Sequence, residues 1–251
     1  MKRFAFTLCI LIGSAALALT QEEPQEEPTN APVADTNHPP ATNAAPATAE
    51  EDAATKKPDI KELIKLPAFT NSSGMIMVKI SDKLWASKYE VTQEEYQKVA
   101  GANPSQSPGN SNPVDSVSWN DALGFCNQLT EAERKEEMLP EGMAYSLPTQ
   151  SQWESFAAGV DLKDAVTGSG AQRSGSSPVG SLGPNSSGMH DVRGNVWEWC
   201  LDPQDKPFRV ARGGAWDTFI EVNLRPEFRW YSNGPDDTKN SIGFRCVLEA
   251  K

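Results

Sequence analysis

The sequence predicts an α+β domain that is rich in loops, with short strands and about three helices. Three observations support this fold class. Three hydroxyl residues stand at helix starts in capping-box patterns. Several short runs alternate apolar and polar side chains as half-buried strands do, and a long Gly- and Ser-rich stretch interrupts the domain.

Four strands and one long loop can be placed on the sequence. The runs Met75–Ile80 and Leu84–Tyr89 are expected to form strands near the start of the domain. Toward the C-terminus, Phe208–Arg212 and Phe244–Leu248 alternate as half-buried strands do. Residues 160–187 are rich in Gly and Ser, so we expect them to form a loop.

Three capping boxes predict the helices. In each box a hydroxyl oxygen accepts a hydrogen bond from a backbone amide three residues on, which would otherwise lack a partner. The expected helices run from Thr92 to about Val99, from Ser118 to about Leu129 and from Thr149 to about Ala158, with Glu95, Asp121 and Gln152 as the third residue after each cap.

The first 20 residues have the pattern of a secretory signal peptide. Lys2 and Arg3 precede the apolar run Phe4–Leu19. Ala16-Leu-Ala18 supplies a small-x-small cleavage site, and Ala18-Leu-Thr20 is a second choice. A membrane anchor is the alternative, but about 16 apolar or small residues are short for a hydrocarbon core of ~30 Å. We therefore expect residues 1–20 to be removed, the protein to be periplasmic or secreted, and no membrane span to remain.

Residues 21–59 are expected to be a disordered linker, and residues 60–251 one domain. The linker is built from Pro, Ala, Thr, Glu and Asn and holds no aromatic residue. It cannot bury enough apolar surface to offset its conformational entropy. All 7 Trp residues lie in the domain, which is long enough for a single core.

The net charge bears on the class of partner that the protein can bind, and the cysteine count bears on whether it forms a disulfide. The chain carries a formal net charge of −11 and has no basic cluster, so we expect no nucleic acid partner. Export would place the protein where disulfides persist. After signal cleavage Cys126, Cys200 and Cys246 remain, and an odd count predicts one bridge and one free thiol.

The run from Asp191 to Glu198 has features of a calcium-binding turn. Ca²⁺ binds six to eight oxygens and favours carboxylates mixed with backbone carbonyls. Asp191 and Glu198 supply carboxylates, Gly194 allows the backbone to turn a carbonyl inward, and Asn195 suits a tight turn. The alternative is a polar loop that binds nothing and is covered by buried tryptophans.

Six short motifs follow one another between residues 75 and 248. They are Tyr89–Thr92, Asn112–Ala122, Leu147–Glu154, Gly188–Trp199, Arg212–Trp216 and Ile242–Arg245. In this order they resemble the motifs of the formylglycine-generating enzyme family, also called sulfatase-modifying factors. The resemblance implies that family's C-type-lectin-like α+β fold, which has little regular structure. Tryptophans in the motifs would pack the core, so most of the match is structural rather than catalytic.

The resemblance also implies a metal site. Carried over position by position, the family's structural calcium site falls on the side chains of Asp191 and Glu198 and on the carbonyls of Gly194 and Val196. We therefore expect a structural Ca²⁺ there. Many members have a second calcium site near a PWGN run, which residues 160–180 lack.

Roles for the cysteines follow from the same resemblance. The family's buried disulfide falls on Cys126 and Cys246, which leaves Cys200 as the free thiol. Formylglycine generators oxidise a substrate cysteine with oxygen, using copper held by two thiolates, the soft ligands that suit Cu(I). Between Gly214 and Cys246 this chain has no cysteine, and Ala215 replaces the family's serine. We expect no copper, no catalytic residue and no formylglycine generation.

Histidine-dependent sites are also unsupported. Related domains in iron enzymes of sulfur–histidine chemistry bind iron through three histidines, and a Ser-His-Asp triad needs a histidine beside a particular serine. This chain has His38 in the linker and His190 in the domain, and nothing marks a partner serine. We expect His190 to be a loop residue.

These observations favour binding over catalysis. We expect a tethered recognition or assembly module in the cell envelope that captures a protein or a glycan on its loops. The alternatives are an oxidoreductase of the formylglycine-generating type, or another enzyme that modifies sulfatase cysteine, with a rebuilt site. A further alternative is a non-catalytic sulfatase accessory.

The expected binding face lies within Trp216–Tyr231. Arginines there can fork onto a carboxylate or sulfate, or they can pair internally with Asp217, Glu221 and Glu227, and Arg245 has the same two options. The residues of the expected face are Trp216, Arg225, Arg229, Trp230 and Tyr231.

Overall fold

The computed structural model describes residue 62 and residues 65–159, 163, 165–168, 174–203, 205–231 and 234–250. The expected signal peptide and linker lie outside the described residues. Among the helices that the structure describes, none has the length and apolar character needed to cross a membrane.

Three α-helices lie in the described residues, and all three begin at the predicted caps. They are α2 (Gln93–Ala100), α3 (Trp119–Lys135) and α4 (Gln150–Ala157). Each has both hydrogen bonds of a capping box, which confirms the sequence prediction. Helix α3 extends past the predicted end at Leu129, because its buried face continues to Glu133.

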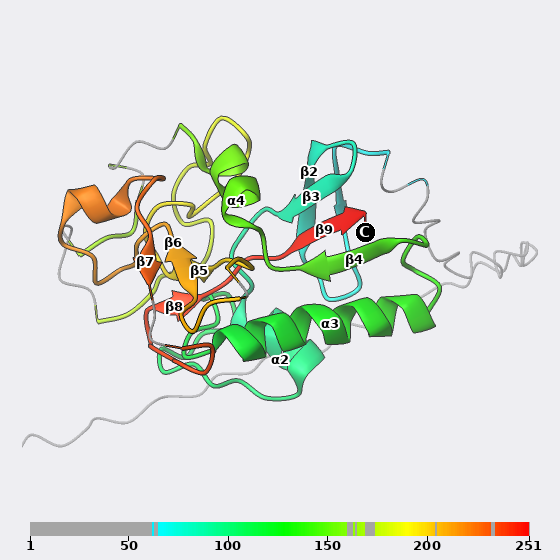
Figure 1. Ribbon diagram of the computed structural model, residues 1–251, viewed down its shortest axis with the longest axis horizontal. Helices are drawn as coiled ribbons and strands as arrows, with labels where there is room; N and C mark the ends of the chain where they lie inside the picture. The colour runs from blue at the N-terminus through cyan, green and yellow to red at the C-terminus, as the bar shows by residue number, and fades with distance from the viewer. Residues whose placement is uncertain are drawn as a thin grey trace, which may run out of the picture. The chain divides into compact units, whose positions relative to one another are not determined.

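A five-stranded sheet packs against α3 (Figure 1). Its strand order is β1-β2-β3-β9-β4, and every neighbouring pair is antiparallel. The predicted strands near residues 75–80 and 84–89 are present. The strands are β1 (Ala68–Thr70), β2 (Ile76–Ser81), β3 (Leu84–Ser87), β4 (Met143–Ser146) and β9 (Val247–Ala250).

A second sheet of four strands carries the tryptophan-rich motifs. Its order is β7-β6-β5-β8, with β5 and β8 parallel and the other pairs antiparallel. The strands are β5 (Trp197–Trp199), β6 (Val210–Arg212), β7 (Trp230–Tyr231) and β8 (Ile242–Gly243). A short 3₁₀ turn, η2 (Glu221–Leu224), lies between β6 and β7 in the chain.

The strand expected over Phe244–Leu248 is shifted. Pairing with β3 begins only at Val247, because the preceding Arg245 turns its side chain inward to a buried carboxylate. β4 and β5 were not predicted, and they are short, with four and three residues. The strand expected over Phe208–Arg212 is present as β6, but all its residues are buried rather than half-buried, because it lies between β7 and β5 in the sheet.

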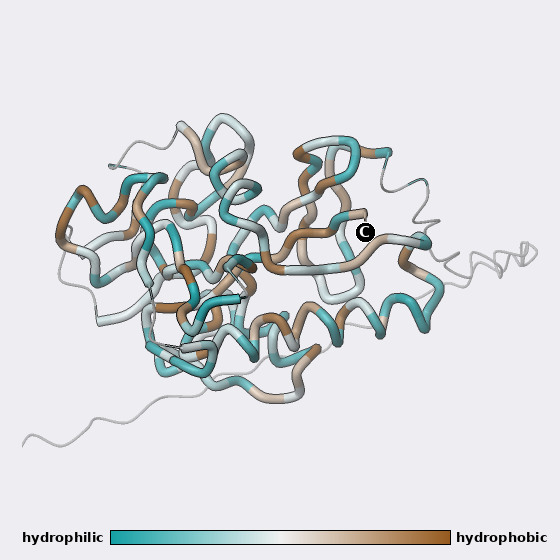
Figure 2. Tube along the Cα trace, in the orientation of Figure 1, coloured by the Kyte–Doolittle hydropathy of each residue, from teal (hydrophilic) through white to brown (hydrophobic). Residues whose placement is uncertain are grey.

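Aromatic rings fill the space between α2, α3 and the chain before β9. Tyr96 stacks on Phe125 with ring centroids 5.4 Å apart, and Phe244 meets Phe125 edge-on at 5.3 Å. Figure 2 shows the result along α3, where hydrophobic and hydrophilic segments alternate around the helix. These ring contacts hold α2 and α3 against the chain before β9. Candidate binding sites are therefore sought in the loops around the four-stranded sheet.

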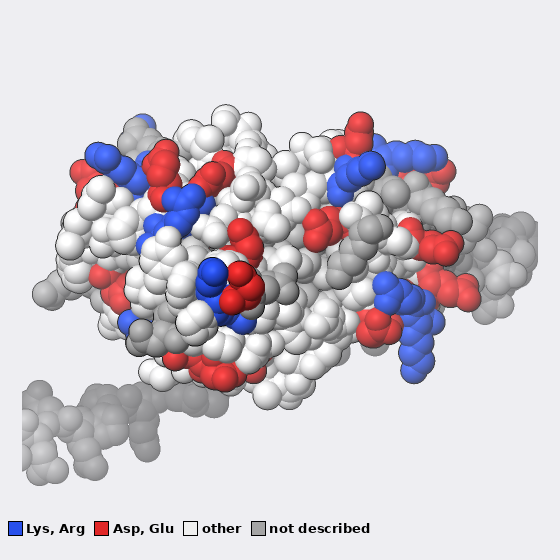
Figure 3. Space-filling view, viewed as in Figure 1, with Lys and Arg blue, Asp and Glu red and all other residues white. Residues whose placement is uncertain are grey.

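Charged side chains on the face shown in Figure 3 form small groups of mixed sign. Lys and Arg stand beside Asp and Glu, and no broad basic area covers the described part of this face. This surface gives a polyanion no continuous track to follow.

Candidate functional site

A pocket of about 380 Å³ lies where the chain after β6 passes β5 and β7. Its walls combine four aromatic rings, hydroxyl and amide groups, and one charge of each sign. The lining residues are Trp197, Asp217, Thr218, Phe219, Ile220, Asn223, Phe228, Trp230, Lys239 and Ser241. Its volume lies within the range of ligand sites, and its lining combines apolar rings with polar groups.

Three of the pocket's rings pack against one another. The ring centroid of Trp197 lies 5.9 Å from that of Phe228 and 5.5 Å from that of Trp230, both tilted. The ammonium nitrogen of Lys239 stands 4.4 Å from the centre of the Trp230 ring, a cation–π contact. This group of rings offers apolar area together with a fixed positive charge.

Two glycines bring the chain into the pocket wall. Gly213 and Gly214 have φ of +93° and +83°, values that L side chains rarely adopt. A Cβ on Gly214 would lie 2.3 Å from Leu224 Cδ2, so the close approach of η2 requires glycine there. Next, the Ala215 amide donates to Thr218 Oγ1 at 2.9 Å, which closes a turn. The segment after this turn forms one wall of the pocket.

The same segment exposes large apolar side chains. Phe219 is 71% exposed, Ile220 61% and Val222 48%. In Figure 2 the stretch leading into η2, orange in Figure 1, is strongly hydrophobic at the edge of the molecule. Adjacent exposed apolar residues beside a pocket mark an interaction surface more often than scattered single ones do. We call Phe219, Ile220 and Val222 the apolar edge.

Of the five residues of the expected binding face, the structure places one in the pocket. Trp230 lines it. The indole nitrogen of Trp216 donates to the Asn240 carbonyl at 3.2 Å, so this ring is half-buried beside the core. Tyr231 is 53% exposed and meets Phe208 edge-on at 5.1 Å.

The arginines of the expected face do not line the pocket. Arg229 donates to Gln150 at 2.8 Å and pairs with Glu154 at 3.2 Å, both on α4. Arg225 is exposed. Arg229 and Arg245 therefore pair internally, which was one of the two expected options. Their partners are Glu154 and Glu198 rather than the expected Asp217, Glu221 and Glu227. Sequence proximity suggested partners that the fold separates.

A buried ion pair stands behind the pocket. Arg245 donates through Nε and Nη2 to both oxygens of Glu198, at distances from 2.6 to 3.0 Å. The side chains are 0% and 1% exposed. Trp153 Nε1 also donates to Glu198, at 2.8 Å. The remaining guanidinium hydrogens reach the carbonyls of Ser87, Lys88 and His190.

Two further carboxyl groups border this ion pair. Glu90 accepts from the Val196 amide at 3.0 Å and from the Asn195 side chain at 2.6 Å. Asp191 accepts from the Gly180 amide at 2.6 Å. Burial raises the pKa of Glu90 well above its usual value, with the nearby carboxylates adding to the shift. Burial also raises the pKa of Asp191.

The expected calcium ligands are adjacent but not all available. Asp191 and Glu198 border the same buried guanidinium, yet both oxygens of Glu198 already accept from Arg245. A cation that prefers six to eight oxygens would have to share or displace that guanidinium. Within the described residues, no group of three or more His, Cys, Asp or Glu side chains is placed to hold a metal ion. With Glu198 engaged by Arg245, the oxygen ligands in this arrangement do not fit Ca²⁺. Calcium binding at this site therefore stays a prediction.

The three cysteines of the domain are buried, away from the pocket lining. Cys126 Sγ lies 3.6 Å from Cys246 Sγ, so the pair predicted to form a disulfide is juxtaposed as two thiols, and the bond stays a prediction. Cys200 lies beside Trp153 and Phe156 in a second apolar cluster. Burial raises the pKa of its thiol well above the usual value, which disfavours the reactive thiolate.

Most of the pocket was not identified from the sequence. Trp197, as a motif tryptophan, was expected to pack the core, and Lys239 and Ser241 lie outside the expected segment Trp216–Tyr231. The sequence did contain one indication of the pocket: Phe219 and Ile220 are two adjacent large apolar residues that follow the polar pair Asp217-Thr218. Such a pair can be recognised as exposed only when the secondary structure on either side of it is known. Here η2 and β7, which follow the pair, were not predicted from the sequence.

Comparison with protein families gives one match that covers most of the chain. The family model described as "Sulfatase-modifying factor enzyme 1-like domain" matches residues 68–250. That range contains both sheets, the three described α-helices and the pocket.

Curated relatives include proteins of different activity. The chain is similar to the chaperone protein LppX of Paenibacillus barcinonensis, 28% identical over 222 residues that cover 63% of this chain and 79% of LppX. It is similar to the inactive C-alpha-formylglycine-generating enzyme 2 of Mus musculus, 32% identical over 159 residues, 55% of this chain and 49% of the relative. The formylglycine-generating enzyme of Streptomyces coelicolor is 27% identical over 199 residues, 62% and 58% of the two chains.

Solved structures confirm the predicted fold class. Treponema denticola variable protein 1 superposes with a TM-score of 0.58 at 24% identity, covering 66% of this chain and 84% of that one. PvdO from Pseudomonas aeruginosa gives 0.58 at 20% identity, covering 72% and 97%. The fold is the C-type-lectin-like α+β fold of formylglycine-generating enzymes.

Proposed function

The chain belongs to the family of sulfatase-modifying factor enzyme 1-like domains, and from this membership we propose that it is a non-catalytic binding or assembly module of the cell envelope. Its ligand is an apolar, extended segment of another protein. The segment lies along the apolar edge and places a side chain in the pocket between Phe219 and Trp230.

The single observation that carries this proposal is the chemistry of the pocket wall. The resemblance to formylglycine generators puts their copper-binding cysteines after the RGG motif, and here that interval, Asp217–Asn223, lines the pocket without a sulfur atom. The domain's own cysteines are buried in the apolar clusters. A two-thiolate site cannot be assembled from these residues, whereas a site for an apolar side chain can.

The choice of a protein segment as ligand has two supports. Phe219, Ile220 and Val222 are exposed close together, and covering each on binding contributes at most about 1.5–3 kcal/mol before the costs of association. One relative carries the name of a chaperone and another the name of an inactive enzyme. These names are consistent with a role for this chain that does not require oxidation of a cysteine.

Location in the envelope rests on the N-terminal pattern of residues 1–20. N-terminal sequencing of the protein from fractionated cells tests it. A mature chain that begins at Leu19 or Gln21 in the periplasmic or secreted fraction is the expected result. An intact Met1 in the cytosol would contradict this part of the proposal.

Binding is tested by titrating the protein with a synthetic peptide that has a short Leu- and Phe-rich centre and neutral polar ends. The fluorescence of the pocket tryptophans should change on binding. Phe219→Ser combined with Ile220→Ser should weaken binding at least tenfold. The matched control is Leu66→Ser, since Leu66 is an exposed apolar residue outside the pocket lining, 45% exposed. Equal binding by both variants would refute the proposed edge.

The catalytic alternative has its own test. The full chain is incubated with a Cys-x-Pro-x-Arg peptide, copper and oxygen, and the peptide mass is measured. Conversion of the cysteine to an aldehyde would establish the enzyme and refute the binding proposal. Unchanged peptide mass, with an active formylglycine-generating enzyme as positive control, is the expected result.

A further inference from the structure

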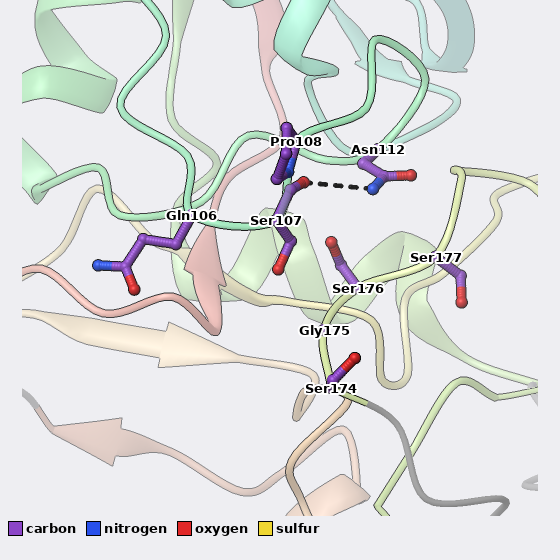
Figure 4. Close-up of a pocket in the computed structure, with 8 residues that line it drawn as sticks. All are labelled: Gln106, Ser107, Pro108, Asn112, Ser174, Gly175, Ser176 and Ser177. Carbon is purple, nitrogen blue, oxygen red and sulfur yellow. Dashed lines mark hydrogen bonds between the residues drawn. The ribbon is translucent and has the colours of Figure 1, made fainter.

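A second pocket lies between two loops that the family motifs do not explain. It has a volume of about 510 Å³, within the roughly 300–1,000 Å³ of typical small-molecule sites. Figure 4 looks into it, with the 106–112 loop on one side and the 174–177 segment on the other. It shares no lining residue with the aromatic pocket.

The lining is neutral and polar throughout. Apart from Pro108 and Gly175, every residue that borders it carries a hydroxyl or an amide, and these are Gln106, Ser107, Asn112, Ser174, Ser176 and Ser177. Among the described lining residues there is no charged side chain to balance a phosphate, a carboxylate or an ammonium group, whose desolvation would be costly. The same described residues include no aromatic or large aliphatic side chain, so an apolar ligand would gain little from them. The chemistry that remains is that of a neutral ligand with many hydroxyl groups.

Two polar atoms of the lining, Ser176 Oγ and Asn112 Oδ1, have no hydrogen-bond partner within the described residues. Ser176 Oγ is buried and makes no hydrogen bond, and a buried hydroxyl left unpaired is unfavourable. Within the described residues the side chain of Asn112 makes one hydrogen bond: its amide nitrogen donates to the Ser107 carbonyl at 3.3 Å, the dashed line in Figure 4. Its Oδ1 stays free to accept. The pocket thus presents donors and acceptors that a ligand can satisfy.

Buried side chains hold the first wall of the pocket in place. Gln93, 1% exposed, donates to the Ser107 carbonyl at 2.8 Å and accepts from the Gly109 amide at 3.0 Å. Asp115, fully buried, accepts from the Gln106 amide at 2.9 Å. The 106–112 loop is therefore fixed from the interior rather than by its own exposed groups.

The second wall is fixed in the same way. Asn195, fully buried, accepts from the Ser177 amide at 2.9 Å and donates to its carbonyl at 3.3 Å. The loops approach so closely that a Cβ on Gly175 would lie 2.4 Å from Ser107 Oγ. A site whose walls are already ordered loses little entropy when a ligand binds.

We propose that this pocket is a binding site for a neutral saccharide, with Ser176 Oγ and Asn112 Oδ1 bonding to sugar hydroxyls. Sugar hydroxyls both donate and accept, so one ring can satisfy several of the lining groups at once. The site is independent of the aromatic pocket, and the domain would then hold a glycan at one place and a protein segment at another.

The test is ¹H–¹⁵N NMR of the full chain titrated with N-acetylglucosamine, chitobiose, glucose and cellobiose at up to tens of millimolar. At least one sugar should shift the amide signals of Ser107 and Ser174–Ser177 in a saturable way. Ser176→Ala should weaken that binding roughly two- to tenfold, the effect of one neutral hydrogen bond. Ser174→Trp, at the exposed rim, should abolish it.

Two controls make the result specific. Ser187→Ala removes an exposed hydroxyl from the same part of the chain, outside the pocket, and should leave affinity unchanged. Phe219→Ser alters the aromatic pocket and should also leave it unchanged. The proposal is overturned if none of the four sugars shifts these amides, if Ser174→Trp still binds while folded, or if glucose 6-phosphate binds more tightly than glucose.

Discussion

Replacing Arg245 by Met should destabilise the domain by about 3–5 kcal/mol, the usual effect of removing one partner from a buried ion pair. The change leaves Glu198, 1% exposed, with Trp153 as its remaining donor. It also removes donors from three carbonyls, among them that of His190. Since a domain is stable by about 5–15 kcal/mol in total, this one substitution removes a large part of the stability.

The effect is measured by urea unfolding of the full chain. With a slope of about 1–3 kcal/mol/M, the midpoint should fall by at least about 1 M. Arg229→Met is the matched control, because Arg229 and its partner Glu154 are both 41% exposed and such a pair contributes about 0–1 kcal/mol. Adding Glu198→Gln to Arg245→Met should recover part of the loss, since it removes the unpaired charge. Equal midpoints for the two Arg→Met variants would refute this account of the ion pair.

Three other predictions concern the same buried region. Burial raises the pKa of Glu90 in the folded protein well above its usual value of 4.5, so this group's contribution to stability is fully present below about pH 4.5 and is lost as pH rises through the folded pKa. Glu90→Gln should flatten that part of the pH dependence of unfolding, and an identical profile would contradict it. The disulfide prediction for Cys126 and Cys246 expects one titratable thiol in the denatured mature chain without reductant and three with it, whereas three in both cases would exclude the bond. The calcium prediction expects the melting midpoint to rise with Ca²⁺ over chelator, and an unchanged midpoint would reject the site at Glu198.

The fold was largely predictable because its signals are local. A capping box needs only a hydroxyl and a residue three positions on, and all three boxes formed as expected. The apolar run that forms β2 is visible within a few residues. The strands β4 and β5 were not recognised, because runs of four and three residues carry too little pattern to mark a strand. Their existence depends on contacts between segments far apart in the chain.

The sites were harder to predict because they depend on such contacts. The possible partners considered for Arg229 were acidic residues close to it in sequence, but its partner in the structure is Glu154 on α4. The expected face contained Trp230 but missed Trp197 and Lys239, which reach the pocket from β5 and from the chain before β8. Residue type indicated that the region could bind something, while only the tertiary arrangement showed which side chains converge.

The family motif around Asn195 is best understood as the anchor from which both pockets are positioned. Its side chain donates to the buried Glu90 and holds both backbone groups of Ser177, in the wall of the polar pocket. Its carbonyl accepts from the Trp216 amide at 2.9 Å, one residue before the wall of the aromatic pocket. Asn195 has φ of +61°, a conformation that asparagine tolerates better than most residues. The motif can thus keep its sequence where cysteine chemistry is lost, because its work here is to fix loops around a buried charge centre.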